Sequence, residues 1–342
     1  MKEHIYIGII GAGIMGSRHA RIYTEMESAV VVGIADIDRT KAQTVADTHG
    51  IVHVSTDYHE ILKLDEIDAI HMATPDYYHT DPVMDALKAG KHVLVEKPLS
   101  TSIEDAQRIV KASQQTGKHV MVNYTHRWAA PYAVTKNIIE DGKLGQPVMV
   151  YAKKDDTLWA STEMMSWTEK TSSAGYLSTH DIDLVLWWLD TNVEHVYALG
   201  VKNLLQKRNI DTEDAIQALV RFKNGAIGTF ESCWVLPTTM PVTTDSYVEL
   251  VGTKGTIHID RLHEGLKVAT EHNYTYPKLS LGCEIFGKER GGVQMCLEYF
   301  VDSLKKGVKP LPDAGNGLKI VKVSKAIQLS MLRGEPVYID SL

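Results

Sequence analysis

The sequence predicts an α/β protein of two domains, the first built on a parallel sheet and the second on a large, mainly antiparallel open sheet. Over residues 1–123, short β-rich apolar runs alternate with helical patterns, which is typical of a parallel sheet wrapped by helices. Beyond them, strand-like stretches alternate apolar and polar residues, which indicates strands with one packed face. The length of 342 residues is too great for one ordinary core. We therefore expect domains over residues 1–123 and 124–342.

The first domain opens on residues 5–10, a nearly continuous apolar run expected of a strand buried on both faces. A helix is expected from Ile14 to Glu25, and a second strand over residues 30–35 ends at Asp36. The remaining elements expected here are strands at 67–73, 92–95 and 119–122, a helix capped by Asp81 with Pro82 next and stopped by Gly90, and a helix over 103–115 preceded by a Thr101–Glu104 capping box.

The second domain is expected to begin after Asn123 with a helix near residues 130–140. Its strands are expected to alternate, and two helices and a short strand close the chain. The ranges are strands at 215–222, 228–234 and 248–259, helices at 294–305 and 316–333, and a strand at 337–339.

The composition is that of a soluble globular protein, with 44% apolar and 23% charged residues. A net charge of −7 gives no reason to expect nucleic acid or an anionic membrane as a partner. No apolar stretch approaches the roughly 20 residues that span a bilayer. The three cysteines have neither metal nor disulfide spacing, so we expect a reducing cytoplasm. We expect no metal, because the histidines show no ligand spacing; those considered are His71, His79, His119 and His126.

Residues 11–16 read Gly-Ala-Gly-Ile-Met-Gly between a buried strand and a helix, with Asp36 20 positions past the last glycine. This context predicts a dinucleotide-binding turn: Gly11 permits the turn, Gly13 lets the backbone approach a pyrophosphate, and Gly16 allows close helix packing. A carboxylate at Asp36 accepts hydrogen bonds from the ribose hydroxyls and repels a 2′-phosphate, which favours NAD over NADP. Arg39 is the feature that could accommodate that phosphate. The alternative is a tight loop without a ligand.

Several further motifs follow in order along the chain. They are His19 three residues after the turn, Ala73-Thr74-Pro75 with His79, Glu96-Lys97-Pro98, Asn123, and His180-Asp181-Ile182-Asp183. In this combination the chain resembles the Gfo/Idh/MocA family, the glucose–fructose oxidoreductase and inositol dehydrogenase group. The resemblance implies a Rossmann domain followed by an α/β domain whose open sheet supplies substrate residues and often an oligomer interface. The cofactor-binding residues it implies are Gly11, Gly13, Ile14, Met15, Gly16, Asp36, Ile37, Arg39, Ala73, Thr74, Pro75, His79, Glu96, Lys97 and Asn123.

Lys97 stands directly beyond a parallel strand, where open α/β sheets place ligands. The resemblance implies that it lies by the nicotinamide and the substrate hydroxyl as an acid/base and orienting group; the plain alternative is a solvated lysine. The resemblance also implies that His180 accepts the alcohol proton, although it could be a core histidine. Family members commonly carry an aspartate four residues before this histidine, where this chain has Tyr176. Tyr176 is a hydroxyl partner or an aromatic wall.

The expected function is an NAD-dependent dehydrogenase that oxidises a secondary alcohol of a sugar, sugar derivative or inositol. Two alternatives stay open: a glycoside-cleaving enzyme that works through a 3-keto intermediate, and a non-catalytic NAD- or sugar-sensing regulator. A homo-oligomer, dimer or tetramer, is expected through the second domain's sheet. The side chains expected to contact the sugar or polyol are Lys97, Tyr124, Arg127, Trp128, Lys153, Asp155, Trp159, Trp167, His180 and Asp183.

Overall fold

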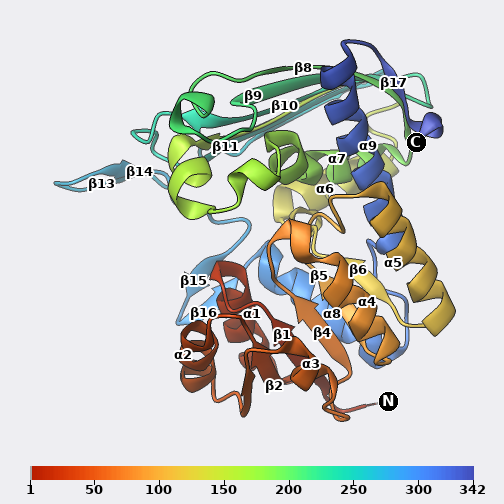
Figure 1. Cartoon of the computed structure of the whole chain (residues 1–342). Helices are drawn as coiled ribbons and strands as arrows, with labels where there is room; N and C mark the ends of the chain where they lie inside the picture. The colour runs from red at the N-terminus through yellow and green to blue at the C-terminus, as the bar shows by residue number, and fades with distance from the viewer. Residues whose placement is uncertain (1) are drawn as a thin grey trace. The chain divides into compact units, whose positions relative to one another are not determined.

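A computed structural model describes residues 2–342 and divides into two compact units (Figure 1). The first unit runs to Thr125 and also contains Glu284–Leu318; the second contains His126–Cys283 and Lys319–Leu342. Glu284–Leu318 therefore departs from the expected domain of residues 124–342. The physical reason is that helix α8 (Gly292–Lys306) packs its apolar side against the first unit's β1 and α1, a contact between distant parts of the chain.

The first unit contains a six-stranded sheet in the order β3-β2-β1-β4-β5-β6. Every pairing in this sheet is parallel, as the sequence predicts. Its central strand β1 is buried on both faces, since the successive residues Ile9 and Ile10, which point to opposite faces, are 0% and 3% exposed. The strands are β1 Ile5–Ile10, β2 Ala29–Ala35, β3 His53–Ser55, β4 Ala69–Met72, β5 His92–Val95 and β6 Val120–Val122.

The helices of the first unit differ from expectation at two caps, and α2 and α3 were not expected. Helix α4 follows directly on a 3₁₀ turn, so it already begins at Thr80 and Asp81 lies inside its first turn. Helix α5 is capped by Ser102, whose hydroxyl accepts from the amide of Asp105 at 3.2 Å, and not by Thr101. The bounds are α1 Ile14–Thr24, α2 Arg39–His49, α3 Tyr58–Leu62, η1 Asp76–Tyr78, α4 Thr80–Lys88 and α5 Ile103–Thr116, with hairpin β15 Cys283–Ile285 and β16 Lys288–Arg290.

The second unit contains a seven-stranded sheet in the order β12-β11-β7-β10-β9-β8-β17. Its pairings are antiparallel except the one between β7 and β10. The single stretch expected over residues 248–259 is two strands, because the chain reverses between Gly252 and Gly255. The strands are β7 Pro147–Thr157, β8 Val193–Val201, β9 Ala215–Phe222, β10 Ile227–Leu236, β11 Thr244–Gly252, β12 Thr256–Asp260 and β17 Val337–Tyr338.

Helices α6 and α7 cover one face of this sheet (Figure 1). On the other face several aliphatic side chains are exposed, among them Leu199 at 62% and Leu219 at 54%. The remaining elements are η2 Thr125–Trp128, α6 Ala130–Glu140, η3 Ala160–Met164, η4 Thr168–Lys170, η5 Ala174–Ser178, α7 Thr179–Leu189, η6 Gln206–Arg208, the hairpin β13 Val268–Ala269 and β14 Tyr274–Thr275, α9 Ala314–Arg333 and η7 Ile339–Ser341. In residues 2–342, no helix combines the length and apolar character that a membrane crossing requires.

Candidate active site

The loops at the carboxyl edge of the parallel sheet carry most of the residues predicted to bind the cofactor. Parallel strands end at one edge, so segments far apart in sequence meet there. They are the glycine-rich turn after β1, Asp36 after β2, residues 73–75 after β4, residues 96–98 after β5 and Asn123 after β6.

The glycine-rich turn is closely packed on one side and open on the other. A Cβ added to Gly16 would lie 1.8 Å from the carbonyl oxygen of Gly11, and one added to Gly11 would lie 2.5 Å from that of Ala73. A Cβ on Gly13, at the start of α1, would meet nothing within 4 Å. Its N-cap is Gly13, and within residues 2–342 no side chain accepts a hydrogen bond from this helix end. The turn therefore leaves open space beside uncapped helix amides, an arrangement that fits a pyrophosphate.

Asp36 joins the turn to the end of β2. Its carboxylate accepts from the amide of Ala12 at 2.7 Å and from that of Asp38 at 2.8 Å. A carboxylate has about four lone-pair positions, so it can still accept ribose hydroxyls. Ile37 is 92% exposed, and the exposed Arg39 begins α2. This edge of the sheet therefore fits an adenosine ribose.

His79 connects the loops after β4 and β5. Its imidazole is fully buried, with Nδ1 2.8 Å from the carbonyl oxygen of Pro98 and Nε2 3.0 Å from that of Thr74. The Thr74 hydroxyl oxygen is buried and makes no hydrogen bond with any described residue. Lys97 is half-buried, and the Lys97–Pro98 peptide bond is cis. The predicted cofactor residue His79 thus supports the Lys97 loop, and the Thr74 hydroxyl is a buried polar group suited to a ligand.

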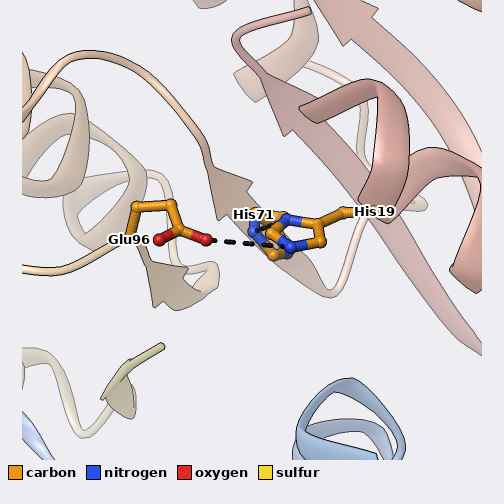
Figure 2. Close-up of side chains that lie close together, drawn as sticks. All are labelled: His19, His71 and Glu96. Atoms are coloured by element: carbon orange, nitrogen blue, oxygen red, sulfur yellow. Dashed lines mark hydrogen bonds and ion pairs between the residues drawn. The ribbon is translucent and has the colours of Figure 1, made fainter. Parts of the chain in front are cut away.

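Glu96, directly after β5, lies in a buried polar cluster with His19 of α1 and His71 of β4 (Figure 2). Asn123 donates to its carboxylate at 2.7 Å, and His19 Nε2 lies 3.8 Å from the same oxygen. The other His19 nitrogen lies 2.8 Å from Nε2 of His71. Burial raises the pKa of Glu96 and lowers that of His71 to about 3.

The sequence analysis set His71 aside and singled out neither Tyr23 nor Cys296. Tyr23 lies 2.9 Å from Nδ1 of His71, and the Cys296 thiol donates to Asn123 at 3.1 Å. No sequence pattern links these residues, because α1, β4 and α8 meet only in the folded unit.

In the second unit, His180 stands at the start of α7 and is half-buried. Its ring lies against that of His126, with 4.2 Å between the centroids and an angle of 34° between the ring planes. Arg261 follows, with its guanidinium 3.4 Å from His126 Nε2, and forms an ion pair with Glu264. His180 therefore belongs to a polar cluster rather than to the apolar core. The sequence analysis did not foresee His126 or Arg261 there.

The predicted substrate residues Arg127 and Asp183 bind each other. The guanidinium donates twice to the carboxylate, at 2.8 and 2.6 Å, and Asp183 is 0% exposed. Trp187 lies beneath the guanidinium, 5.2 Å from ring centroid to Cζ. This pair fastens the turn η2 to α7 and so supports the helix that carries His180.

Lys153, Lys154 and Asp155 follow one another on β7, so the alternation of the strand sends Lys154 to one face of the sheet and the other two side chains to the opposite face. Lys153 pairs with Asp245 at 2.6 Å, and Asp155 lies 3.7 Å from the Lys153 ammonium on the same face. Lys154 points to the opposite face and reaches Asp181 of α7 at 3.1 Å. The helix-covered face of the sheet therefore presents Lys154, which the sequence analysis did not single out, because alternation alone does not tell which face is covered.

The aromatic residues predicted at the substrate site lie in different environments. Tyr176 and Trp167 pack on an apolar cluster that contains Trp234. Trp159 is 39% exposed, whereas Tyr124 is fully buried and Trp128 is half-buried.

Comparison with known proteins identifies the class that this fold defines. A model described as "Oxidoreductase family, NAD-binding Rossmann fold" matches residues 5–124. A second, "Oxidoreductase family, C-terminal alpha/beta domain", matches residues 136–339. The protein is thus an oxidoreductase with an NAD-binding domain. The chain belongs to the Gfo/Idh/MocA family, which confirms the resemblance and the predicted fold class.

Relatives align over almost the whole chain. An inositol 2-dehydrogenase of Rubrobacter xylanophilus is 26% identical over 344 residues, which cover 100% of this chain and 95% of the relative. A scyllo-inositol 2-dehydrogenase (NAD(+)) of Bacillus subtilis is 25% identical, with coverage of 99% and 98%. The structure of scyllo-inositol dehydrogenase from Lactobacillus casei with bound NAD(H) and scyllo-inositol shares the fold, with a TM-score of 0.85, 20% identity and coverage of 98% and 99%.

Proposed function

We propose that this protein is an NAD-preferring dehydrogenase that oxidises a secondary alcohol of a polyol, either a sugar, a sugar derivative or an inositol. One observation carries the proposal: the glycine-rich turn, Asp36 and Lys97 lie along the carboxyl edge of a single parallel sheet. The names of the full-length relatives support the polyol class.

Each predicted site residue would have a distinct role. The open N-terminus of α1 would hold the pyrophosphate, and Asp36 the adenosine ribose. When bound, the nicotinamide supplies the hydride acceptor. Lys97 would orient the substrate hydroxyl and exchange its proton. His180, a residue of the second unit, would accept that proton. Tyr176 remains a candidate partner of the hydroxyl.

The preference for NAD rests on the Asp36 carboxylate. Two backbone amides hold it at the end of β2, so its charge stays where a 2′-phosphate would come. The test is the kcat/KM ratio for NAD and NADP in the wild type and in Asp36→Ser, with Asp38→Ser as control. We expect the variant to lose preference for NAD; a wild type that prefers NADP would contradict the proposal.

The function is tested by following NADH formation with a panel of inositols, aldoses and glycosides. We expect turnover with at least one polyol, and Lys97→Ala should bind NAD while losing turnover. Glycoside cleavage without net NADH would favour the first alternative, and NAD binding without any turnover would favour the regulator. The relatives named above support neither alternative.

We further propose that the protein is a homo-oligomer of the cytoplasm that assembles through the uncovered face of the second sheet. Tyr197 lies directly opposite Leu219 on this face, beside Leu199 and Ile227. Exposed aliphatic side chains on adjacent strands are typical of an interface. Light scattering should show a dimer or tetramer that Leu219→Lys dissociates; a monomeric wild type would contradict the proposal.

A further inference from the structure

The polar cluster around Glu96 contains two arms that meet at its carboxylate. One arm runs from Tyr23 through His71 to His19, and the other from Cys296 through Asn123. Figure 2 shows how the rings of His19 and His71 and the Glu96 carboxylate face one another. Tyr23, His19 and His71 are each 0% exposed, so no water competes for their hydrogen-bonding groups.

Two histidines and a carboxylate in such proximity can hold a metal ion, but this arrangement opposes one. His19 Nδ1 and His71 Nε2 are 2.8 Å apart. Two nitrogens bound to one tetrahedral ion at about 2.0–2.1 Å would lie roughly 3.3 Å apart. The second nitrogen of His71 faces Tyr23 at 2.9 Å. The short separation is that of a hydrogen bond, so the imidazoles bind each other.

The direction of the hydrogen bonds follows from counting donors. If Tyr23 donates to His71, then His71 donates to His19 through Nε2, and the remaining His19 N–H points at Glu96. The hydrogens of Tyr23 and His71 then each have an acceptor, and the His19 N–H faces the Glu96 carboxylate at 3.8 Å, which is beyond hydrogen-bond range but electrostatically favourable. In the reverse direction the Tyr23 hydroxyl hydrogen is left without an acceptor, since His71 is its hydrogen-bond partner among residues 2–342. That direction would also turn a His19 lone pair toward the Glu96 carboxylate, so both effects favour the first direction.

The other arm has the same sense. The Cys296 thiol donates to the Asn123 oxygen, and the Asn123 amide donates to Glu96. Glu96 thus accepts a hydrogen bond at the end of this arm, faces the His19 N–H at the end of the other, and is followed in sequence by Lys97. Burial raises the pKa of Glu96, and the Asn123 hydrogen bond and the Lys97 charge oppose that effect.

We propose that Tyr23, His71 and His19 form a one-way hydrogen-bond chain whose last N–H faces the Glu96 carboxylate, and that the chain favours the ionised form of Glu96 and thereby positions Lys97. The role toward Lys97 rests on the proposed function. Tyr23 and His71 are positioning residues in this chain, because they act only through Glu96.

Nitrogen-15 NMR of the histidine rings tests the chain without any substrate. We expect His19 and His71, assigned by substitution, to be neutral and protonated at Nε2 between pH 6 and 8. Tyr23→Phe should shift the His71 ring signals, whereas Tyr58→Phe, which removes another hydrogen-bonded hydroxyl of the first unit, should not. A His71 protonated at Nδ1, or an imidazolium at pH 6, would overturn the direction.

Kinetics test the role toward Lys97. Loss of one hydrogen bond in Tyr23→Phe should lower kcat about fivefold with little change in KM. In a Glu96→Gln background the same substitution should have almost no further effect, because the two act as one unit. Multiplicative effects would overturn the positioning role. If NMR shows the expected tautomers but no polyol is turned over, the proposed function and the role toward Lys97 are contradicted. The hydrogen-bond chain itself would still stand.

Discussion

The ion pair between Arg127 and Asp183 provides a sharp test of what the predicted substrate residues do. Asp183→Asn keeps the shape of the side chain but removes its charge. The Arg127 guanidinium would then stay buried, with its side chain 12% exposed, beside a neutral amide. We expect the second unit to lose stability and α7 to lose its attachment to η2.

The magnitude follows from the burial of both partners. Breaking a buried pair by removing one charge costs about 3–5 kcal/mol, and an isosteric amide should lie near the lower end. At 2–4 °C per kcal/mol for a unit of this size, the melting temperature should fall by about 6–12 °C. The apolar double variant Arg127→Met/Asp183→Leu should recover most of this loss, because no unpaired charge remains.

Equilibrium unfolding followed by tryptophan fluorescence is the assay, since Trp187 lies beneath the guanidinium. The control is Asp141→Asn, which breaks an exposed pair with Lys143 and should cost less than about 0.5 kcal/mol. If Asp183→Asn unfolds like the wild type while KM for the polyol rises tenfold, Asp183 binds substrate and the structural account is wrong.

Three further results are expected. Gly13→Ala should fold normally yet weaken NAD binding at least tenfold by isothermal titration. Gly16→Ala should unfold at lower temperature, because its Cβ would meet a carbonyl oxygen at 1.8 Å. Equal stability of the two variants would contradict the packing argument. His79→Leu should lower kcat more than it raises KM, since both ring nitrogens face carbonyls of the loops around Lys97; a pure KM effect would exclude this role. Burial, with the nearby Glu231 charge, raises the pKa of Asp155 to about 7, so in the folded state this carboxyl keeps its proton to a higher pH than in the unfolded chain. Its stabilising contribution is complete below the unfolded pKa near 4 and is lost as pH rises through 7, a slope that should be absent from unfolding curves of Asp155→Asn.

Strands β1, β4, β5 and β6 could be predicted from local patterns because they are buried and read as apolar runs. The short, partly exposed strand β3 and the helices α2 and α3 were not predicted. The caps of α4 and α5 could not be predicted, because several neighbouring polar residues can cap a helix. The path by which the chain enters the helix determines which of them does. The assignment of Glu284–Leu318 to the first unit depends on the burial of α8 against β1, which no local pattern reports.

The sequence by itself determined the family, and it predicted the nucleotide-binding turn and the roles of Asp36 and Lys97, because these features depend on a few residues at short spacing. Only the tertiary structure decided the neighbours of each group. It placed Tyr23 and His71 behind Glu96, paired Arg127 with Asp183, and turned Lys154 rather than Lys153 toward α7. The physical reason is that the contacts Tyr23–His71, Arg127–Asp183 and Lys154–Asp181 join residues 27 to 56 positions apart and arise from sheet register and helix packing.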